Sequence, residues 1–282
     1  MRIKVGDCAL FFDVEGAKLR PDGPRMREVP TLLLLHGGPG FDHSSFKPAM
    51  SPLAEVAQII YLDHRGQGRS DRSASERWTL ATWADDVRKF CDALEIERPI
   101  VMGHSFGGFV AAAYAARHPE HPGKLILSST AGRLRLDRAY DMFERLGGKE
   151  ARTIAERFWQ DPSEQTAADY IRVCFPLYNR SAALSDADSM RRTVFNRELM
   201  YRFIVGEGRT FDLLPELGRI QCPTLLLAGE DDPICPIRDA EDIAQRIPAN
   251  LLRFERFANA GHGVFRDLPE AALRVMREFI ES

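Results

Sequence analysis

The sequence contains little cysteine, and its cysteines form no recognisable pairs. Five occur in 282 residues, an odd number, widely spaced and without a C-x-x-C motif. This pattern argues against a disulfide framework and a zinc knuckle, and it favours a reducing compartment. The seven histidines likewise include no H-E-x-x-H motif. We therefore predict no metal, no cofactor and a cytoplasmic location.

The sequence also has no large excess of positive or negative charge and no long apolar run. The chain has 38 basic and 41 acidic residues, a formal net charge of -3 and no run of lysine or arginine. A nucleic-acid partner is therefore not expected. No stretch approaches the length of a transmembrane helix, and residues 1–16 lack the apolar segment of a secretion signal. We expect no membrane association, a small-molecule partner, and a monomer or small homo-oligomer.

Short apolar runs alternate with helical patterns along much of the chain. Most of the runs are apolar at every position, which is typical of parallel strands covered on both faces. They are residues 31–35, 58–63, 99–103, 124–129, 224–229 and 251–257. Helical periodicity occupies residues 79–96, 109–122 and 268–282, and a Gly-Asp turn joins two alternating strands in residues 2–12. This order predicts an α/β fold with a mostly parallel central sheet flanked by helices.

The alternation of strand and helix stops between residues 133 and 217. This segment is helical in pattern and rich in aromatic residues. Helices inserted between two strands predict a cap over the C-terminal edge of the sheet, where open α/β sheets bind ligands. We therefore divide the chain into an α/β core, residues 1–132 and 218–282, and a helical cap, residues 133–217. Most of the cap aromatics are expected to pack within the cap itself.

Residues 103–107 read Gly-His-Ser-Phe-Gly and fit the pattern G-x-S-x-G. They follow a strand and precede an alanine-rich helix, the context in which this pattern forms a strained turn with an exposed serine hydroxyl. A side chain at Gly103 or Gly107 would collide with the neighbouring strand or helix, which explains two glycines there. The pattern also arises by chance from this composition with a probability of roughly 0.08. Its position between strand and helix carries the prediction that Ser105 is a catalytic nucleophile.

A serine nucleophile needs a histidine base and a carboxylate that orients this base. Two turn-rich loops that follow strands supply both. Residues 230–232 hold three carboxylates, and residues 259–263 hold His262. We choose Asp232 as the acid because it lies deepest in the turn before Pro233. His262 is then the base, and both side chains are expected at the same sheet edge as Ser105.

A glycine-rich loop follows the strand at 31–35. Residues 36–40 read His-Gly-Gly-Pro-Gly, which exposes backbone N–H groups without side chains in the way. The N–H groups of Gly38 and Phe106 are therefore predicted to form an oxyanion hole. The alternative for this loop is a plain glycine turn. A phosphate-binding loop is disfavoured because no G-K-[ST] follows.

Four of the other histidines, namely His64, His104, His118 and His121, are expected to be structural or solvent-exposed. His104 lies beside the nucleophile and is expected to point into the fold as a structural residue. His64, His118 and His121 are expected at the surface, in loops or at helix ends.

Four motifs together resemble the α/β-hydrolase superfamily, and within it the proline iminopeptidases. They are HGGPG at 36–40, LDHRGQGRSD at 62–71, GHSFGG at 103–108 and NAGHG at 259–263. The resemblance covers the whole core and implies the α/β-hydrolase fold. It supports Asp232 as the acid, because the family pattern G-x-x-D-x-x-x-P then ends at Pro236. It also implies that Asp63 and Arg65 hold the chain near the oxyanion loop.

The sequence departs from proline iminopeptidases at positions that affect the substrate. It has His64 where those enzymes usually have glutamine, and Phe106 where tryptophan is common. They bind the substrate's α-amine with glutamates, and one such position is Pro233 here. Glu198 or Glu207 could substitute for the glutamate of the cap.

Four residues are predicted to contact the substrate, namely Phe41, Trp159, Tyr201 and Arg202. An arginine that faces the pocket would favour a carboxylate, carbonyl or lactone oxygen over an ammonium group. The sequence therefore favours a serine hydrolase that cleaves a small carboxylic ester or lactone through an acyl-enzyme. The alternatives are a proline iminopeptidase-like aminopeptidase or amidase, and a non-catalytic relative that binds a small molecule.

Overall fold

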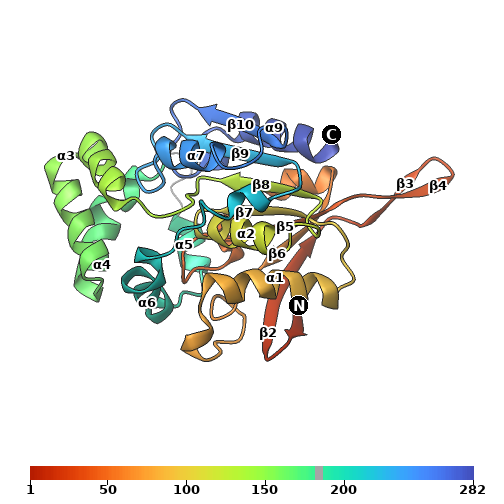
Figure 1. The fold of residues 1–282 in the computed structure, drawn as a ribbon, viewed down its shortest axis with the longest axis horizontal. Coiled ribbons are helices and arrows are strands. Elements are labelled where there is room, and N and C mark those ends of the chain that lie inside the picture. Colours follow the sequence, from red (N-terminus) through yellow and green to blue (C-terminus); the bar gives the residue numbers. More distant parts are fainter. Residues whose placement is uncertain (182–186) are drawn as a thin grey trace.

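The computed structural model describes residues 1–181 and 187–282, and an eight-stranded sheet lies at its centre (Figure 1). In the order in which they lie side by side, the strands are β1 (Arg2–Val5), β2 (Cys8–Glu15), β6 (Gln58–Leu62), β5 (Thr31–Leu35), β7 (Ile100–His104), β8 (Lys124–Ser128), β9 (Thr224–Gly229) and β10 (Leu252–Phe257). Strands β1 and β2 pair antiparallel, and β5 to β10 are parallel. The predicted α/β fold with a mostly parallel sheet is thus confirmed.

Strand β5 shows why the apolar runs form the centre of the sheet. All of its residues are buried. Leu33 and Leu35 pack into a core on one face of the sheet, together with α1 (Leu80–Ala93), α2 (Phe106–Arg117) and α7 (Ile237–Ala244). Leu32 and Leu34 pack into a second core on the other face, together with α8 (Val264–Asp267) and α9 (Pro269–Glu281). Because strand side chains alternate between faces, a run of leucines fills both cores.

The helices between β8 and β9 occupy the segment for which the sequence predicts a cap. They are α3 (Leu136–Gln160), α4 (Glu164–Val173), α5 (Ala187–Arg192) and α6 (Arg197–Val205). Figure 1 shows α3, α4 and α6 together at one end of the molecule. Helix α3 is interrupted at Gly148, where φ is 74°. We call residues 133–217 the cap, although its boundaries as a domain stay a prediction.

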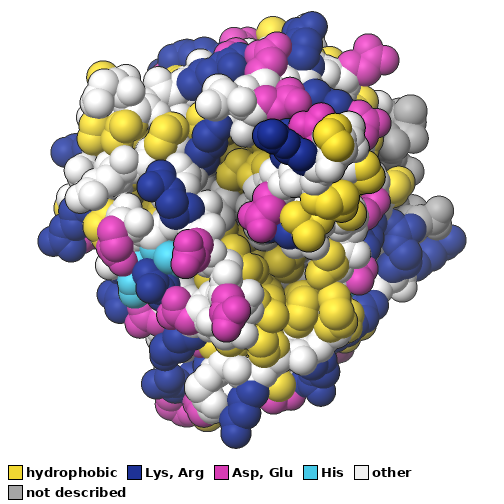
Figure 2. All heavy atoms as spheres, turned by 90° about the vertical axis from the view of Figure 1, so that its right-hand side faces the viewer, with side chains coloured by type: hydrophobic (Ala, Val, Ile, Leu, Met, Phe, Trp, Pro, Cys, Tyr) yellow, Lys and Arg dark blue, Asp and Glu magenta, His cyan; other side chains and the backbone are white. Residues whose placement is uncertain are grey.

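A small hairpin projects from the opposite end of the molecule and was not expected from the sequence. Its strands are β3 (Leu19–Asp22) and β4 (Arg25–Glu28), and nearly all of their residues are exposed. Figure 2 shows the end from which it projects, where hydrophobic side chains gather around a hollow and charged side chains surround them. These strands lack alternating apolar residues, so the sequence carries no periodic signal for them.

Two features of the composition, the cysteines and the lack of long apolar runs, can be examined in the structure. Each of the five cysteines is a buried free thiol. Among the residues that the structure describes, no helix combines the length and the apolar character that crossing a membrane requires.

The parallel register brings four chain segments to one edge of the sheet. Leu35 of β5 pairs with Gly103 of β7, and Gly229 of β9 pairs with Phe257 of β10. The loops that follow these four strands therefore leave the sheet at the same edge. They carry the glycine-rich loop, Ser105, the carboxylate cluster and His262.

A buried ion pair fixes the loop at 63–71 to the helix beneath it. The Arg65 side chain is 1% exposed, and its Nε and Nη2 donate to Asp86 of α1 at 2.6 and 2.8 Å. Arg65 also contacts Asp7 in the β1–β2 turn at 2.9 Å. Arg65 thus joins the N-terminal hairpin, the loop and α1, which is the structural role that the family resemblance implies.

Replacing Asp86 should destabilise the fold much more than replacing its neighbour Asp85. Asp86→Asn leaves the buried guanidinium without its main counter-charge, so we expect a loss of about 3 kcal/mol in unfolding free energy. Asp85 pairs with Arg117 and His118 at the surface, and Asp85→Asn should cost less than about 1 kcal/mol. Urea unfolding followed by circular dichroism measures both values. Equal losses in the two variants would contradict the role given to the buried pair.

Candidate active site

Ser105 lies in a strained turn between β7 and α2. Its φ and ψ are 54° and -121°, a left-handed conformation that is uncommon for residues with a side chain. The turn is held by its backbone, because the Ser105 N–H donates to the Ser128 carbonyl at 3.0 Å. Its carbonyl accepts from the Thr130 hydroxyl at 2.8 Å. Neighbouring structure thus enforces the conformation that the G-x-S-x-G motif predicts.

The glycines around Ser105 are needed because backbone segments touch there. A Cβ on Gly103 would lie 2.2 Å from the carbonyl oxygen of Gly107. A Cβ on Gly107 would lie 2.0 Å from the carbonyl oxygen of Leu35 in β5. Both distances are far below van der Waals contact. The collisions that the sequence analysis expects at these two positions therefore match the geometry.

His262 and Asp232 form a buried pair. His262 Nδ1 lies 2.8 Å from Asp232 Oδ2, and the Asp232 side chain is fully buried. Because a carboxylate can only accept, Nδ1 carries a proton and Nε2 of the neutral ring is the free base. The other carboxylate oxygen accepts from the backbone N–H groups of Ile234 and Cys235, both at 2.9 Å. These bonds fix the carboxylate and hence the orientation of the imidazole.

The three neighbouring carboxylates have different surroundings in the structure. Asp232 alone of the three meets His262 among the described contacts. Asp231 contacts Arg145 at 2.5 Å and Arg180 at 3.4 Å. Glu230 is exposed. The geometry therefore agrees with the choice of Asp232.

The glycine-rich loop lies directly against Ser105. A Cβ on Gly37 would lie 3.3 Å from Cβ of Ser105, and Gly38 has a φ of 134°. In the described part of the chain, neither the Gly38 nor the Phe106 backbone N–H donates a hydrogen bond to another residue. Phe106 is the first residue of α2, where the helix dipole is positive. The two predicted oxyanion donors are thus unused and flank the serine.

The loop at 63–71 supports the glycine-rich loop from below. Asp63 Oδ1 accepts a hydrogen bond from the His43 backbone N–H and also lies 2.7 Å from His43 Nδ1. Asp63 Oδ2 accepts a hydrogen bond from the Arg69 backbone N–H. The Gln67 side chain accepts from the Gly40 N–H at 2.6 Å. Asp63 thus anchors the chain near the glycine-rich loop, as the resemblance implies.

The expectation for His64 was wrong. It is 2% exposed, and its backbone N–H donates to Nε2 of His36 at 3.3 Å. Burial lowers the pKa of both imidazoles, with a further lowering of the His64 pKa by His36. His64 is buried because its loop passes beneath the glycine-rich loop, which sequence position alone does not reveal. His104 is buried as expected, and its ring centroid lies 5.1 Å from that of His262.

Ser105 and His262 open into a cavity of about 340 Å³ between the sheet edge and the cap. Of the four predicted contact residues, Phe41, Trp159 and Tyr201 line it, and Arg202 does not. Most of the other lining side chains are apolar or aromatic, among them Phe109, Leu134, Phe158, Tyr170, Ile171, Phe175, Met200, Phe203, Ile204 and Ile234. Several cap aromatics therefore face the cavity rather than a core of the cap alone.

The arginine of α6 that lines the cavity is Arg197 and not the predicted Arg202. The cavity-lining residues of α6 are Arg197, Met200, Tyr201, Phe203 and Ile204. The spacing of three and four residues between Arg197, Met200, Tyr201 and Ile204 describes one helix face. Arg202 lies outside that set. Sequence reasoning thus named an arginine of α6 that does not line the cavity, and it missed the one that does.

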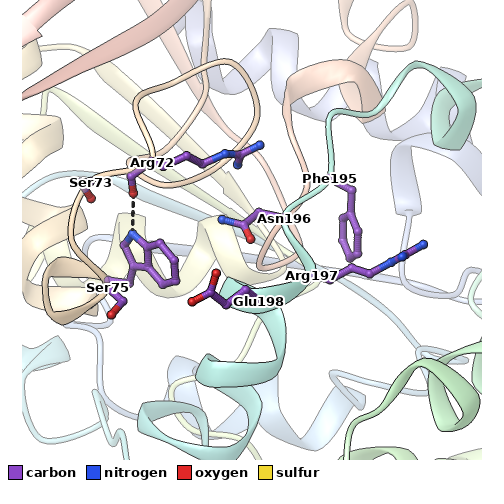
Figure 3. Close-up of a pocket in the computed structure, with 8 residues that line it drawn as sticks. Arg72, Ser73, Ser75, Phe195, Asn196, Arg197 and Glu198 are labelled. Atoms are coloured by element: carbon purple, nitrogen blue, oxygen red, sulfur yellow. Dashed lines mark hydrogen bonds between the residues drawn. The ribbon is translucent and has the colours of Figure 1, made fainter.

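Neither glutamate considered as an amine ligand lies in this cavity. Glu207 accepts from the Leu80 N–H at 2.9 Å at the start of α1, and burial raises its pKa. Glu198 lines a separate surface cleft of about 700 Å³ beside Trp78. Figure 3 shows the Glu198 and Arg197 side chains extending in opposite directions. Among the described residues that line the cavity, none is an aspartate or a glutamate.

Cap residues are bonded directly to the loop of His262, to the glycine-rich loop and to the loop at 63–71. The Tyr178 carbonyl accepts from the His262 N–H at 2.6 Å. The Asn196 N–H donates to the Gly40 carbonyl at 2.7 Å, and its side-chain amide donates to the Gly66 carbonyl at 2.8 Å. Sequence reasoning missed these residues, because cap contacts follow no local motif. The described residues contain no group of three histidine, cysteine, aspartate or glutamate side chains that could hold a metal.

The chain is similar to known proteins in both sequence and structure. A family model for the alpha/beta hydrolase fold matches residues 30–267. The proline iminopeptidase PfmaB of Pestalotiopsis fici is 30% identical over 96% of this chain and 99% of its own length. The structure of a proline iminopeptidase from Mycobacterium smegmatis matches with a TM-score of 0.81 and 24% identity, covering 100% of this chain and 97% of that one. A thermophilic esterase from Thermogutta terrifontis matches with a TM-score of 0.73 and 26% identity, covering 100% and 98%.

The close approach at Gly107 makes a specific prediction about stability. In Gly107→Ala the new methyl group would force α2 away from β5, and we expect a loss of about 1–3 kcal/mol in unfolding free energy. Gly218→Ala is the matched control, because the nearest atom to a Cβ there is 3.8 Å away. The control should change stability by less than about 0.5 kcal/mol. Chemical denaturation compares them, and a Gly107→Ala protein as stable as the control would refute the contact.

Proposed function

The chain belongs to the α/β-hydrolase family, and on this premise we propose that it hydrolyses small carboxylic esters or lactones through an acyl-enzyme on Ser105. In the proposed reaction, Nε2 of His262 removes the proton from the Ser105 hydroxyl as Oγ attacks the carbonyl carbon. The carbonyl oxygen becomes an oxyanion that accepts from the N–H groups of Gly38 and Phe106. The protonated His262 then gives its proton to the alkoxide leaving group.

The second half of the cycle uses the same groups. His262 removes a proton from water, the hydroxide attacks the acyl carbon, and Ser105 leaves as an alcohol after it regains a proton. Asp232 holds the imidazole and stabilises its charged form throughout. The buried His262–Asp232 pair at 2.8 Å supports these roles.

The lining of the cavity is the observation that carries the preference for esters or lactones. An aminopeptidase substrate presents an α-ammonium group, which needs a carboxylate where water is excluded. None of the described lining residues supplies one. An ester or lactone places no ammonium group in the site and fits apolar and aromatic walls. The similarity to proline iminopeptidases makes cleavage of N-terminal prolyl amides the second candidate.

A panel of substrates tests the class of reaction. We expect hydrolysis of p-nitrophenyl esters and of simple lactones, and much slower release of p-nitroaniline from prolyl p-nitroanilide. Ser105→Ala should lower the turnover of the good substrates by about 10⁴-fold or more. Its circular dichroism spectrum should match that of the wild type.

Two results would contradict this reading. A clear preference for the prolyl amide would favour the aminopeptidase. Equal ester turnover by Ser105→Ala and wild type would show that Ser105 is not the nucleophile. A single stoichiometric burst without sustained turnover would instead favour the third reading, a protein that binds a small molecule.

The neighbouring aspartates offer a matched pair of variants. Asp232→Asn should reduce kcat by about 10⁴-fold, because an amide in this position disfavours the required tautomer of His262. Asp231→Asn removes a charge that faces Arg145 and Arg180, and it should leave kcat within about twofold. Steady-state kinetics on the best ester measures both. Similar losses in the two variants would mean that Asp232 is not the acid of the triad.

A further inference from the structure

Arg197 brings a positive charge to the wall of the cavity. It is the first residue of α6, after the helix cap formed by Asn196. It lies on the helix face that lines the cavity, and it also lines the neighbouring surface cleft. The other charged side chain in the described lining is Arg266, which donates to the Ser45 carbonyl at 3.1 Å. The described walls thus carry positive charge and no carboxylate.

The one ion pair of Arg197 among the described residues is weak. Arg197 Nη1 lies 3.5 Å from Oε1 of Glu164, and the two side chains are 66% and 85% exposed. Exposed pairs of this kind contribute little to stability. An anion that enters the cavity can therefore replace Glu164 as the partner of Arg197 at small cost.

Tyr201 places a second donor beside Arg197. The two residues are four apart on α6 and therefore neighbours on one helix face. The Tyr201 hydroxyl is buried and has no hydrogen-bond partner within the described ranges. Burial raises the pKa of Tyr201, and the nearby charge of Arg197 opposes this rise. A buried hydroxyl without a partner is costly unless a ligand satisfies it.

We propose that Arg197 and Tyr201 together bind an anionic group of the substrate, so that esters or lactones bearing a carboxylate are preferred over neutral ones. This inference rests on the proposed hydrolase function and names its substrate class. The guanidinium supplies charge and N–H donors, and the phenol supplies an O–H donor on the same face. Neither donor belongs to the predicted oxyanion hole, so the anionic group is distinct from the carbonyl that Ser105 attacks.

The experiment compares charged and neutral substrates of equal length. The probes are p-nitrophenyl hydrogen adipate and p-nitrophenyl hydrogen suberate, each beside its methyl ester. These chains are long enough to keep the carboxylate from attacking its own ester. A second arm places the charge on the alcohol side, with 4-carboxyphenyl butyrate beside its methyl ester. The readout is the ratio of kcat/KM for the charged and the neutral member of each pair.

The variants isolate the two donors. We expect Arg197→Gln to lower this ratio by about fivefold, which is near the upper range for an ion pair at an exposed position. Tyr201→Phe should lower it by about threefold. Arg202→Gln is the control, because it removes the same charge from the same helix on a face outside the cavity. It should keep the wild-type ratio, and 0.5 M NaCl should reduce that ratio in the wild type.

The outcomes separate this inference from the proposed function. A fall of the ratio in one arm alone identifies whether the anion belongs to the acyl or the alcohol side. Ser105-dependent hydrolysis of the neutral esters with equal ratios in Arg197→Gln and Arg202→Gln would overturn the inference and leave the hydrolase function intact. Absence of Ser105-dependent hydrolysis of every ester would overturn the proposed function and this inference with it.

Discussion

The contact between the end of β7 and the start of α2 sets the geometry on which the rest of the site depends. At Gly103 and Gly107 the strand, the helix and β5 approach so closely that a methyl group has no room. This closeness forces Ser105 into its left-handed conformation and starts α2 directly after it. The same constraint therefore sets the backbone conformation of Ser105 and the starting point of α2 at Phe106. Strain at this residue is maintained because packing on both sides over-determines it.

The other groups reach Ser105 because parallel strands end at one edge, but the cap also helps to hold them. His262 is fixed by Asp232 through its ring and by Tyr178 of the cap through its backbone. The glycine-rich loop is fixed by Gln67 from the core and by Asn196 of the cap. His262 and the glycine-rich loop are each bonded to both the core and the cap. A shift of the cap would therefore change the positions of both around Ser105 as well as the shape of the cavity.

How much the sequence could predict depended on whether a feature is local. Ser105 and Asp232 each sit in a short turn after a buried apolar strand, and His262 follows a strand of mixed composition, so pattern and chain order were sufficient to propose them. The burial of His64 depends on a second loop that lies above it, and no neighbouring residue signals this. The β3–β4 hairpin has neither an apolar face nor a periodic pattern. Features that depend on distant segments or on exposed polar strands therefore could not be predicted from the sequence.

The same limit applies within helix α6, where Arg197 lines the cavity and the predicted residue Arg202 does not. Which face of α6 meets the cavity is set by where the helix begins, and it begins after Asn196, whose side chain accepts from the Leu199 N–H. Asn196 is in turn held by Gly40 and Gly66 of the core. The rotation of α6, and with it the charge that α6 presents to the cavity, is thus fixed by bonds to the loops that surround Ser105. The lining of the cavity and the arrangement of the loops around Ser105 therefore depend on the same hydrogen bonds.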